Sequence, residues 1–160
     1  MTSVEDYLFY VDEALDGMIA IVEDLGDHLA NLRPDVPGSN TPYVILYHCL
    51  GVMEYWAGQV VAGRDVVRDR AAEFVASGPV EDLVRRARGA RVRLAEDLTG
   101  AEPAAPPRRP TAADPDDAVV NRTQGGALIH LYEELAQHRG QMEGCRDVLR
   151  APWAKLVRQT

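Results

Sequence analysis

The segment 121–150 constrains the fold of this 160-residue chain most strongly, because its apolar residues repeat with the period of an α-helix. At about 100° per residue, one face of such a helix carries Ala127, Leu128, Leu131, Leu135, Met142, Cys145 and Leu149. Glu134 and His138 stand within this stripe, one turn apart. Burying a carboxylate and an imidazole costs roughly several kcal/mol unless a partner binds them. The segment therefore predicts a long core helix with two polar groups that need a partner.

That partner need not be a metal ion. Side chains at positions i and i+4 touch each other on any helix, so Glu134 and His138 can satisfy one another and serve packing alone. A third ligand-capable side chain on another helix would favour a metal site instead.

Three further segments show the same helical period. The predicted helices run from residue 3 to about 32, from 42 to about 62, from 79 to about 98, and from 121 or 123 to 150. Ser3 and Thr41 are the expected N-caps of the first two, and Asn121 or Thr123 that of the last. We find no segment with the period of a strand. The sequence therefore predicts an all-α protein, a four-helix bundle in one domain spanning residues 1–160.

Two of the connections are longer than simple turns. Residues 63–78 carry alternating charges, and we expect them to mix a helical turn with loop. The charged residues expected to face solvent there are Arg64, Asp65, Arg68, Asp69 and Arg70. Residues 99–120, between the third and fourth helices, contain five Pro and no helical period. This Pro-rich connection is either a lid across one end of the bundle or a linker.

The second predicted helix supplies the third polar group. It is apolar on nearly all sides, which is typical of a helix enclosed by neighbours, and His48 is its single imidazole. Together with Glu134 and His138 it offers two imidazoles and a carboxylate to one bundle interior. This ligand set matches a catalytic zinc site with an open fourth position, and iron(II) accepts the same set. The sequence thus predicts a divalent metal site at His48, Glu134 and His138, with zinc favoured over nickel or iron.

The remaining candidates surround this site. His130 is expected toward the edge of the same helix face, and His130 or Gln141 would orient the ligands. His28 is expected on the surface. The residues expected to border the open position, or else to serve only as core, are Tyr47, Tyr55, Trp56 and Gln59.

Composition excludes several classes of protein. The net charge of −8 and the pI near 4.9 argue against a nucleic-acid partner. No apolar run approaches 18 residues, and the N-terminus carries acids where a signal peptide needs basic residues. Cys49 and Cys145 form no CxxC motif. We therefore expect a cytoplasmic protein with reduced cysteines and no membrane partner.

The segments HCLGVMEYW and EELAQHRGQMEGCRDVL resemble the DinB/YfiT-like metal-binding bundles, and within them the mycothiol-dependent branch that includes maleylpyruvate isomerase. The resemblance implies a four-helix bundle whose ion, usually zinc, is held by His48, Glu134 and His138. Many relatives have His at the position of Glu134, whereas the mycothiol-dependent branch has Glu. The HRGQ tetrad at 138–141 is also shared. Maleylpyruvate isomerase has a further C-terminal domain that supplies an arginine to the site. Because this sequence ends at Thr160, that particular isomerisation is not the activity we expect.

The expected activity follows from an open metal position. A thiol bound there would lose its proton and attack an electrophile; the resemblance implies mycothiol, or bacillithiol or glutathione in other lineages. We therefore expect a metal-dependent thiol transferase or isomerase-like enzyme acting on a small-molecule thiol and an electrophile. The alternatives are a hydrolase that uses metal-bound water, a non-enzymatic metal-binding bundle related to stress, and an interaction bundle without metal. The apolar second helix and the first helix also suggest a homodimer.

Overall fold

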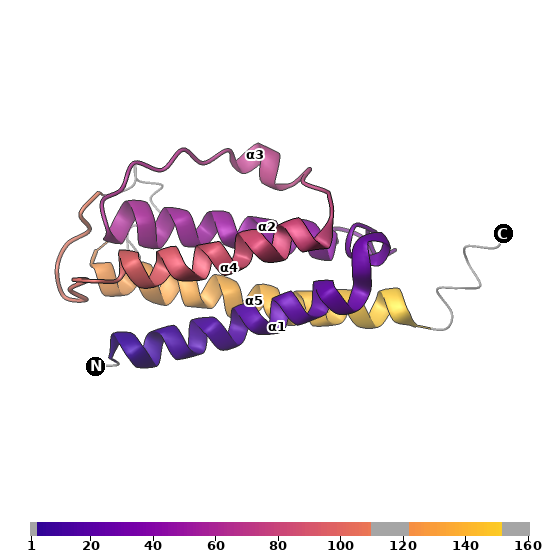
Figure 1. The fold of residues 1–160 in the computed structure, drawn as a ribbon, viewed down its shortest axis with the longest axis horizontal. Helices are drawn as coiled ribbons and strands as arrows, with labels where there is room; N and C mark the ends of the chain where they lie inside the picture. Colours follow the sequence, from indigo (N-terminus) through magenta and orange to yellow (C-terminus); the bar gives the residue numbers. More distant parts are fainter. Residues whose placement is uncertain (1–2, 110–121, 152–160) are drawn as a thin grey trace.

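The computed structural model describes residues 3–109 and 122–151 of the chain. Four long helical rods lie side by side in it (Figure 1). The elements, in chain order, are α1 (Val4–Ala30), α2 (Pro42–Met53), η1 (Glu54–Val61), α3 (Arg70–Glu73), α4 (Val80–Asp97) and α5 (Gln124–Arg150). The described residues contain no strand. The predicted all-α four-helix bundle is confirmed, and the short α3 is the helical turn that was expected within residues 63–78.

The core lies along the axis of the bundle. Helices α1 and α2 each pack against both α4 and α5. The apolar stripes read from the sequence face this centre, because burying them removes roughly 25 cal/mol per Å² of unfavourable apolar hydration. Large side chains that are fully buried there include Leu15, Met18, Leu46, Leu50, Leu83, Leu94, Leu131 and Leu135.

Side-chain caps begin three of the four long helices. Ser3 and Asp6 form a capping box at α1, and the Thr41 hydroxyl accepts a hydrogen bond from the Val44 amide at α2. At α5 the cap is Thr123. These caps satisfy backbone amides that have no partner inside the helix, which explains why the predicted starts are confirmed.

The second helix differs from its prediction. It is α-helical only to Met53 and continues as the π-helical η1 to Val61, where one continuous helix to about residue 62 was expected. A π-helix is wider than an α-helix and is often found at functional sites. In η1 it places the Trp56 side chain, which is buried, against α5 at His130.

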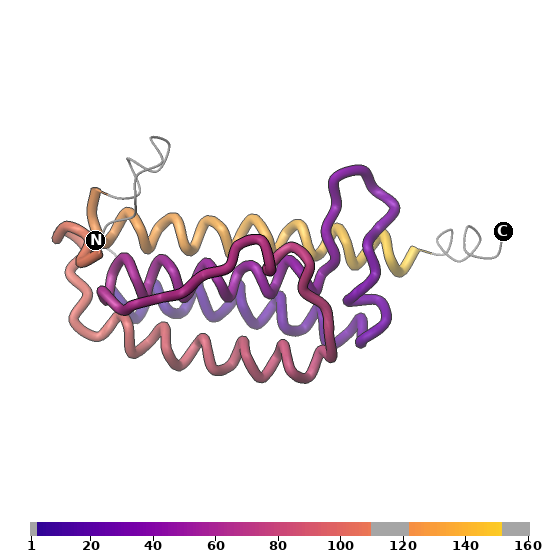
Figure 2. Tube along the Cα trace, turned by 90° about the horizontal axis from the view of Figure 1, so that it is seen from above, coloured from indigo at the N-terminus to yellow at the C-terminus, as the bar shows by residue number. Residues whose placement is uncertain are grey.

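Residues 62–79, here called the crossover, join η1 to α4 and include α3. Figures 1 and 2 show the crossover running lengthwise over α2, between α5 and α4. The prediction that Arg64 and Arg68 face solvent is wrong. Arg64 binds the nearly buried Asp97 and the partly exposed Glu54, and Arg68 binds the buried Glu73, because the crossover folds back onto the bundle.

The Pro-rich connection is described only to residue 109. Its first part lies at the end of the bundle where η1 stops and α5 starts: the Arg108 amide donates to the Val60 carbonyl, and the Gly125 amide to that of Pro103. Residues 110–121 lie outside the described part of the chain, so the choice between a lid and a linker stays open there. Within the described ranges, no helix combines the length and the apolar character that crossing a bilayer requires.

Candidate metal centre

The three predicted ligands lie together between α2 and α5. Nε2 of His48 is 3.7 Å from Oε2 of Glu134, and the same oxygen is 3.4 Å from Nε2 of His138. The candidate ligand atoms all lie within 4.8 Å of one another. Ligands of a tetrahedral zinc ion lie about 3.4 Å apart when each is about 2.1 Å from the metal. The two measured separations are therefore close to those of a bound set.

Burial differs among the three side chains. His48 is 7% exposed, whereas Glu134 and His138 are 29% and 27% exposed. The expectation that the α5 pair stands within the core stripe is thus wrong. The fully buried Leu131 and Leu135 occupy the core, and the pair lies at the edge of the contact between α2 and α5. This edge position leaves the Glu134 and His138 side chains partly exposed to solvent.

The cluster also changes the acidity of its members. The neighbouring His138, and then His48, hold the pKa of the Glu134 carboxyl well below its ordinary range, although burial opposes this shift. Glu134 in turn raises the pKa of His138, against the effect of burial. A carboxylate and an adjacent imidazolium therefore stabilise each other when no cation is bound.

In both histidines the ring nitrogen that faces away from the cluster, Nδ1, forms a hydrogen bond with a neighbouring side chain. Nδ1 of His138 lies 2.8 Å from Oε1 of Gln141, and Nδ1 of His48 lies 2.7 Å from Oε2 of Glu73. Both acceptors favour a proton on Nδ1, which leaves the Nε2 atoms free to bind a cation. The expected contact of Gln141 is present.

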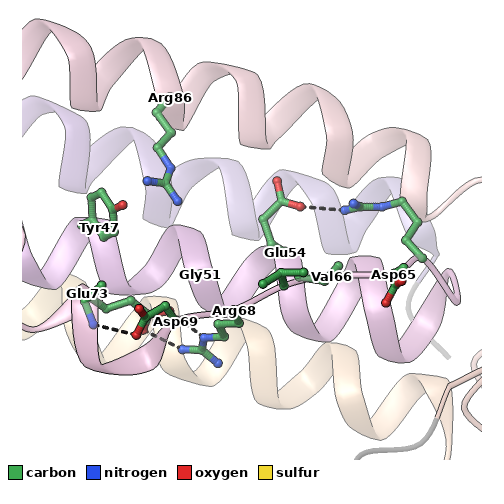
Figure 3. Close-up of a pocket in the computed structure, with 12 residues that line it drawn as sticks. Tyr47, Gly51, Glu54, Asp65, Val66, Arg68, Asp69, Glu73 and Arg86 are labelled. Atoms are coloured by element: carbon green, nitrogen blue, oxygen red, sulfur yellow. Dashed lines mark hydrogen bonds and ion pairs between the residues drawn. The ribbon is translucent and has the colours of Figure 1, made fainter.

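Glu73 was not singled out from the sequence. It lies in a connection that was expected to be solvent-facing, yet it is 3% exposed. The one sequence signal was Gly51, which leaves space one turn after His48. Figure 3 shows Glu73 beside Gly51, joined to Arg68 by ion pairs.

His130 borders the cluster on the side of η1. Its Nε2 lies 3.8 Å from Oε1 of Glu134, and its ring meets that of Trp56 edge to face at 4.8 Å. His130 thus contacts the Glu134 oxygen that points away from His138. This agrees with its expected place at the edge of the site.

The remaining candidates separate into two groups. Trp56 lies against His130, and Tyr55 meets Trp56 edge to face at 5.4 Å, with the Arg68 guanidinium 5.6 Å from the centre of its ring. Gln59 is half-buried one turn further. Tyr47 lies elsewhere. It lines a cavity of about 410 Å³ under the crossover, with the Arg86 guanidinium 4.1 Å above its ring (Figure 3).

This cavity is on the Nδ1 side of His48, because Glu73 also lines it. Tyr47 therefore does not border the Nε2 atoms, where it was expected. Neighbouring residues on a helix point about 100° apart, which separates Tyr47 from His48. His28 is exposed, as predicted.

Comparison with known protein families identifies a match to this chain. The profile of the family described as mycothiol-S-transferase (MST) matches residues 7–151. The chain belongs to the mycothiol-S-transferase family. Membership confirms the predicted resemblance to the mycothiol-dependent DinB-like proteins, and it implies transferase activity related to mycothiol, with a small-molecule thiol as substrate.

A solved structure agrees with the fold of this mycothiol-S-transferase family member. The crystal structure of a conserved protein from Enterococcus faecalis matches with a TM-score of 0.68 and 13% sequence identity, covering 93% of this chain and 98% of that chain. At this identity the match concerns the fold alone. No curated protein matches the chain in sequence.

Proposed function

We propose that this chain is a metal-dependent mycothiol S-transferase whose divalent ion, zinc first, is bound by His48, Glu134 and His138. The observation that carries the proposal is the convergence of two Nε2 atoms and a carboxylate oxygen within 4.8 Å, on a partly exposed edge. Two imidazoles and one carboxylate suit zinc and iron(II) alike, and nickel also accepts imidazole ligands. Family membership supports the thiol.

The chemistry divides between the ion and the chain. A bound divalent ion supplies the positive charge that favours thiolate over thiol at neutral pH. The chain holds the imidazoles with their Nε2 atoms toward the cluster, through Glu73 and Gln141. Glu134 contributes a negative charge, and the partial exposure of the α5 pair admits a thiol and an electrophile.

The alternatives make different use of the same residues. A hydrolase would activate water at the open position. A non-enzymatic metal-binding bundle would need no access for a second molecule, and the 27–29% exposure of the α5 pair favours an open site. The family assignment favours transfer over hydrolysis.

Metal content tests the proposal. Tag-free protein purified without chelator should hold about one zinc, nickel or iron per chain, and His138→Ala should lose it. His28→Ala is the matched control, because His28 is exposed on α1 and should leave metal content unchanged. Wild-type protein that neither contains nor takes up metal would refute the site.

A cobalt(II)-loaded sample then separates transfer from the alternatives. Adding mycothiol should produce a thiolate-to-cobalt charge-transfer band, and adding an alkylating electrophile should convert the thiol to a thioether. Binding of mycothiol without a new band would contradict coordination of the thiol. Hydrolysis without any use of thiol would favour the hydrolase.

We also infer a homodimer, through α1 as expected but with α5 in place of α2. All of α2 except Tyr47 is buried within the monomer, so α2 offers no free face. The exposed Phe9, Tyr10 and Ile129 gather instead beside an apolar hollow of about 290 Å³ between α1 and α5. A face with both protruding apolar side chains and a hollow can pair with itself about a twofold axis.

Sedimentation tests the dimer. Ile129→Asp should shift the wild-type dimer to monomer, whereas Val92→Asp on α4, also exposed, should not. A monomeric wild type would refute the dimer.

A cytoplasmic location fits the free cysteines Cys49 and Cys145, and cell fractionation tests it. That residues 1–160 form a single domain stays a prediction, which limited proteolysis would test.

A further inference from the structure

We propose that Glu73 is the positioning residue for His48: the crossover fixes the tautomer and the orientation of this imidazole, so that Nε2 faces Glu134 and His138. The inference rests on the proposed metal site and extends it to a segment outside the bundle proper. The crossover thereby becomes part of the site, and the ligand set depends on a residue 25 positions from His48.

The contact between Glu73 and His48 assigns the ring proton. Oε2 of Glu73 lies 2.7 Å from Nδ1 of His48, and the two residues are 3% and 5% exposed. A carboxylate only accepts hydrogen bonds, so Nδ1 carries a proton, and in the neutral ring Nε2 then keeps its lone pair. Nη2 of Arg68 lies 3.4 Å from the same nitrogen and, as a donor, would favour an unprotonated Nδ1. Its bond to Oε2 of Glu73 is shorter, at 2.9 Å, and so is the 2.7 Å contact of Nδ1 with that oxygen, so the carboxylate decides the position of the ring proton.

The carboxylate is itself held on both oxygens. Arg68 donates from Nε to Oε1 at 2.6 Å and from Nη2 to Oε2 at 2.9 Å, in the bidentate geometry that guanidinium favours. The next residue, Phe74, stacks on the His48 ring at 5.3 Å with the planes 29° apart. Two consecutive crossover residues therefore hold the ring, one at its edge and one on its face.

Gly51 makes this approach possible. It lies one turn after His48 on the same side of α2, and the Glu73 carboxylate occupies the space beside it. A Cβ atom at position 51 would overlap both Oε1 and the carboxyl carbon of Glu73. The backbone at Gly51 is helical, so its conformation alone does not require glycine. Glycine is required there because the Glu73 carboxylate occupies the space of a side chain.

The local structure of the crossover aims Glu73. Asp69 caps α3 by accepting a hydrogen bond from the Ala72 amide, which sets the single turn that ends at Glu73. Arg68 precedes this turn and reaches back to Glu73. The contacts among Arg68, Asp69 and Glu73 therefore lie within one short segment, and this segment contacts the bundle at His48.

The test compares three variants with the wild type. Glu73→Gln keeps the shape of the side chain but puts an amide NH₂ where only an acceptor satisfies both Arg68 and His48. Gly51→Ala keeps every ligand and Glu73 itself, and displaces the carboxylate by steric overlap. Asp65→Asn is the matched control, because Asp65 is an exposed crossover carboxylate that pairs with Arg109 and not with His48 or Arg68.

The first measurement needs no metal. Long-range ¹H–¹⁵N NMR of metal-free protein reports which nitrogen of His48 carries the proton. Wild type and Asp65→Asn should show the Nδ1-protonated ring, and Glu73→Gln and Gly51→Ala should show a mixture of tautomers. A wild-type ring protonated on Nε2 would overturn the inference.

The second measurement is zinc affinity, from competition with a chromophoric chelator. We expect about a 10- to 100-fold loss for Glu73→Gln and for Gly51→Ala, and none for Asp65→Asn. Wild-type affinity and tautomer in both altered variants would overturn the positioning role while the metal site stood. If Glu73→Gln does not fold, Gly51→Ala decides; if the wild type binds no zinc, the proposed function fails and the tautomer alone decides the role of Glu73.

Discussion

Oε2 of Glu134 lies 3.4 Å from Nε2 of His138, one helical turn along α5. In metal-free protein this contact makes the carboxylate and the imidazolium stabilise each other, which lowers the pKa of Glu134 and raises that of His138. A cation that binds the same two atoms must displace the proton from His138, because a metal binds the neutral imidazole. Metal binding and proton binding are therefore linked at this pair.

Zinc uptake near pH 6.5 should release a proton. The Glu134 carboxylate raises the pKa of His138 above its ordinary value of 6.5, so more than half of the rings carry a proton at pH 6.5 in metal-free protein. Zinc affinity should rise with pH until His138 is neutral and then level off. Calorimetry in buffers of different ionisation enthalpy measures the protons released; a heat independent of the buffer near pH 6.5 would contradict the linkage.

The same pair should give metal-free protein a pH-dependent stability. The contribution of Glu134 is complete above its ordinary pKa of 4.5 and is lost as pH falls through its lowered folded value. The contribution of His138 is complete below 6.5 and is lost as pH rises through its raised folded value. Urea unfolding of wild type and Glu134→Gln should therefore differ most between pH 4.5 and 6.5. A difference that grows steadily above this range would refute the assignment.

Arg64→Met should destabilise the fold without touching the candidate metal site. Arg64 binds Asp97 at 2.7 Å and Glu54 at 2.8 Å, and the Asp97 side chain is 7% exposed. Removing the guanidinium leaves a nearly buried carboxylate unpaired, and we expect a loss of about 1–3 kcal/mol in the free energy of unfolding. Arg85→Met, which breaks only exposed pairs, should cost about 0.5 kcal/mol or less. Zinc affinity should stay at the wild-type value in both.

Two glycine-to-alanine substitutions in helices should have opposite signs. A Cβ atom at Gly144 meets open space, so Gly144→Ala should stabilise the protein by about 0.5–1 kcal/mol through helix propensity. A Cβ atom at Gly58 would overlap the Arg64 guanidinium, so Gly58→Ala should destabilise it. Thermal unfolding of both variants against wild type checks this. Equal stabilisation in both would show that Arg64 moves freely away from Gly58.

Much of the fold follows from local signals. The caps at Ser3, Thr41 and Thr123 and the apolar periods placed the four long helices within a few residues of their observed bounds. These signals act within one or two turns, so they are visible in the chain itself. The change to π-helix after Met53 was not visible, because the apolar pattern of residues 42–62 carries no local signal that distinguishes the two helix types.

For the candidate site, too, one part followed from local sequence signals and the other part only from the tertiary structure. The spacing of Glu134 and His138 determined by itself that the two side chains meet, since positions i and i+4 are neighbours on any helix. The meeting with His48, and the partial exposure of the α5 pair, were decided by how α2 packs on α5.

Glu73 could not be found from the sequence, because the crossover has no periodic pattern and its charges read as solvated. Only the tertiary structure brings this carboxylate over Gly51 to His48, since contacts between distant segments depend on the packing of the whole bundle. The sequence determined the helices and their ligand-bearing faces through local geometry. The packed bundle decided which faces meet, which groups are buried and which carboxylate orients the ligand.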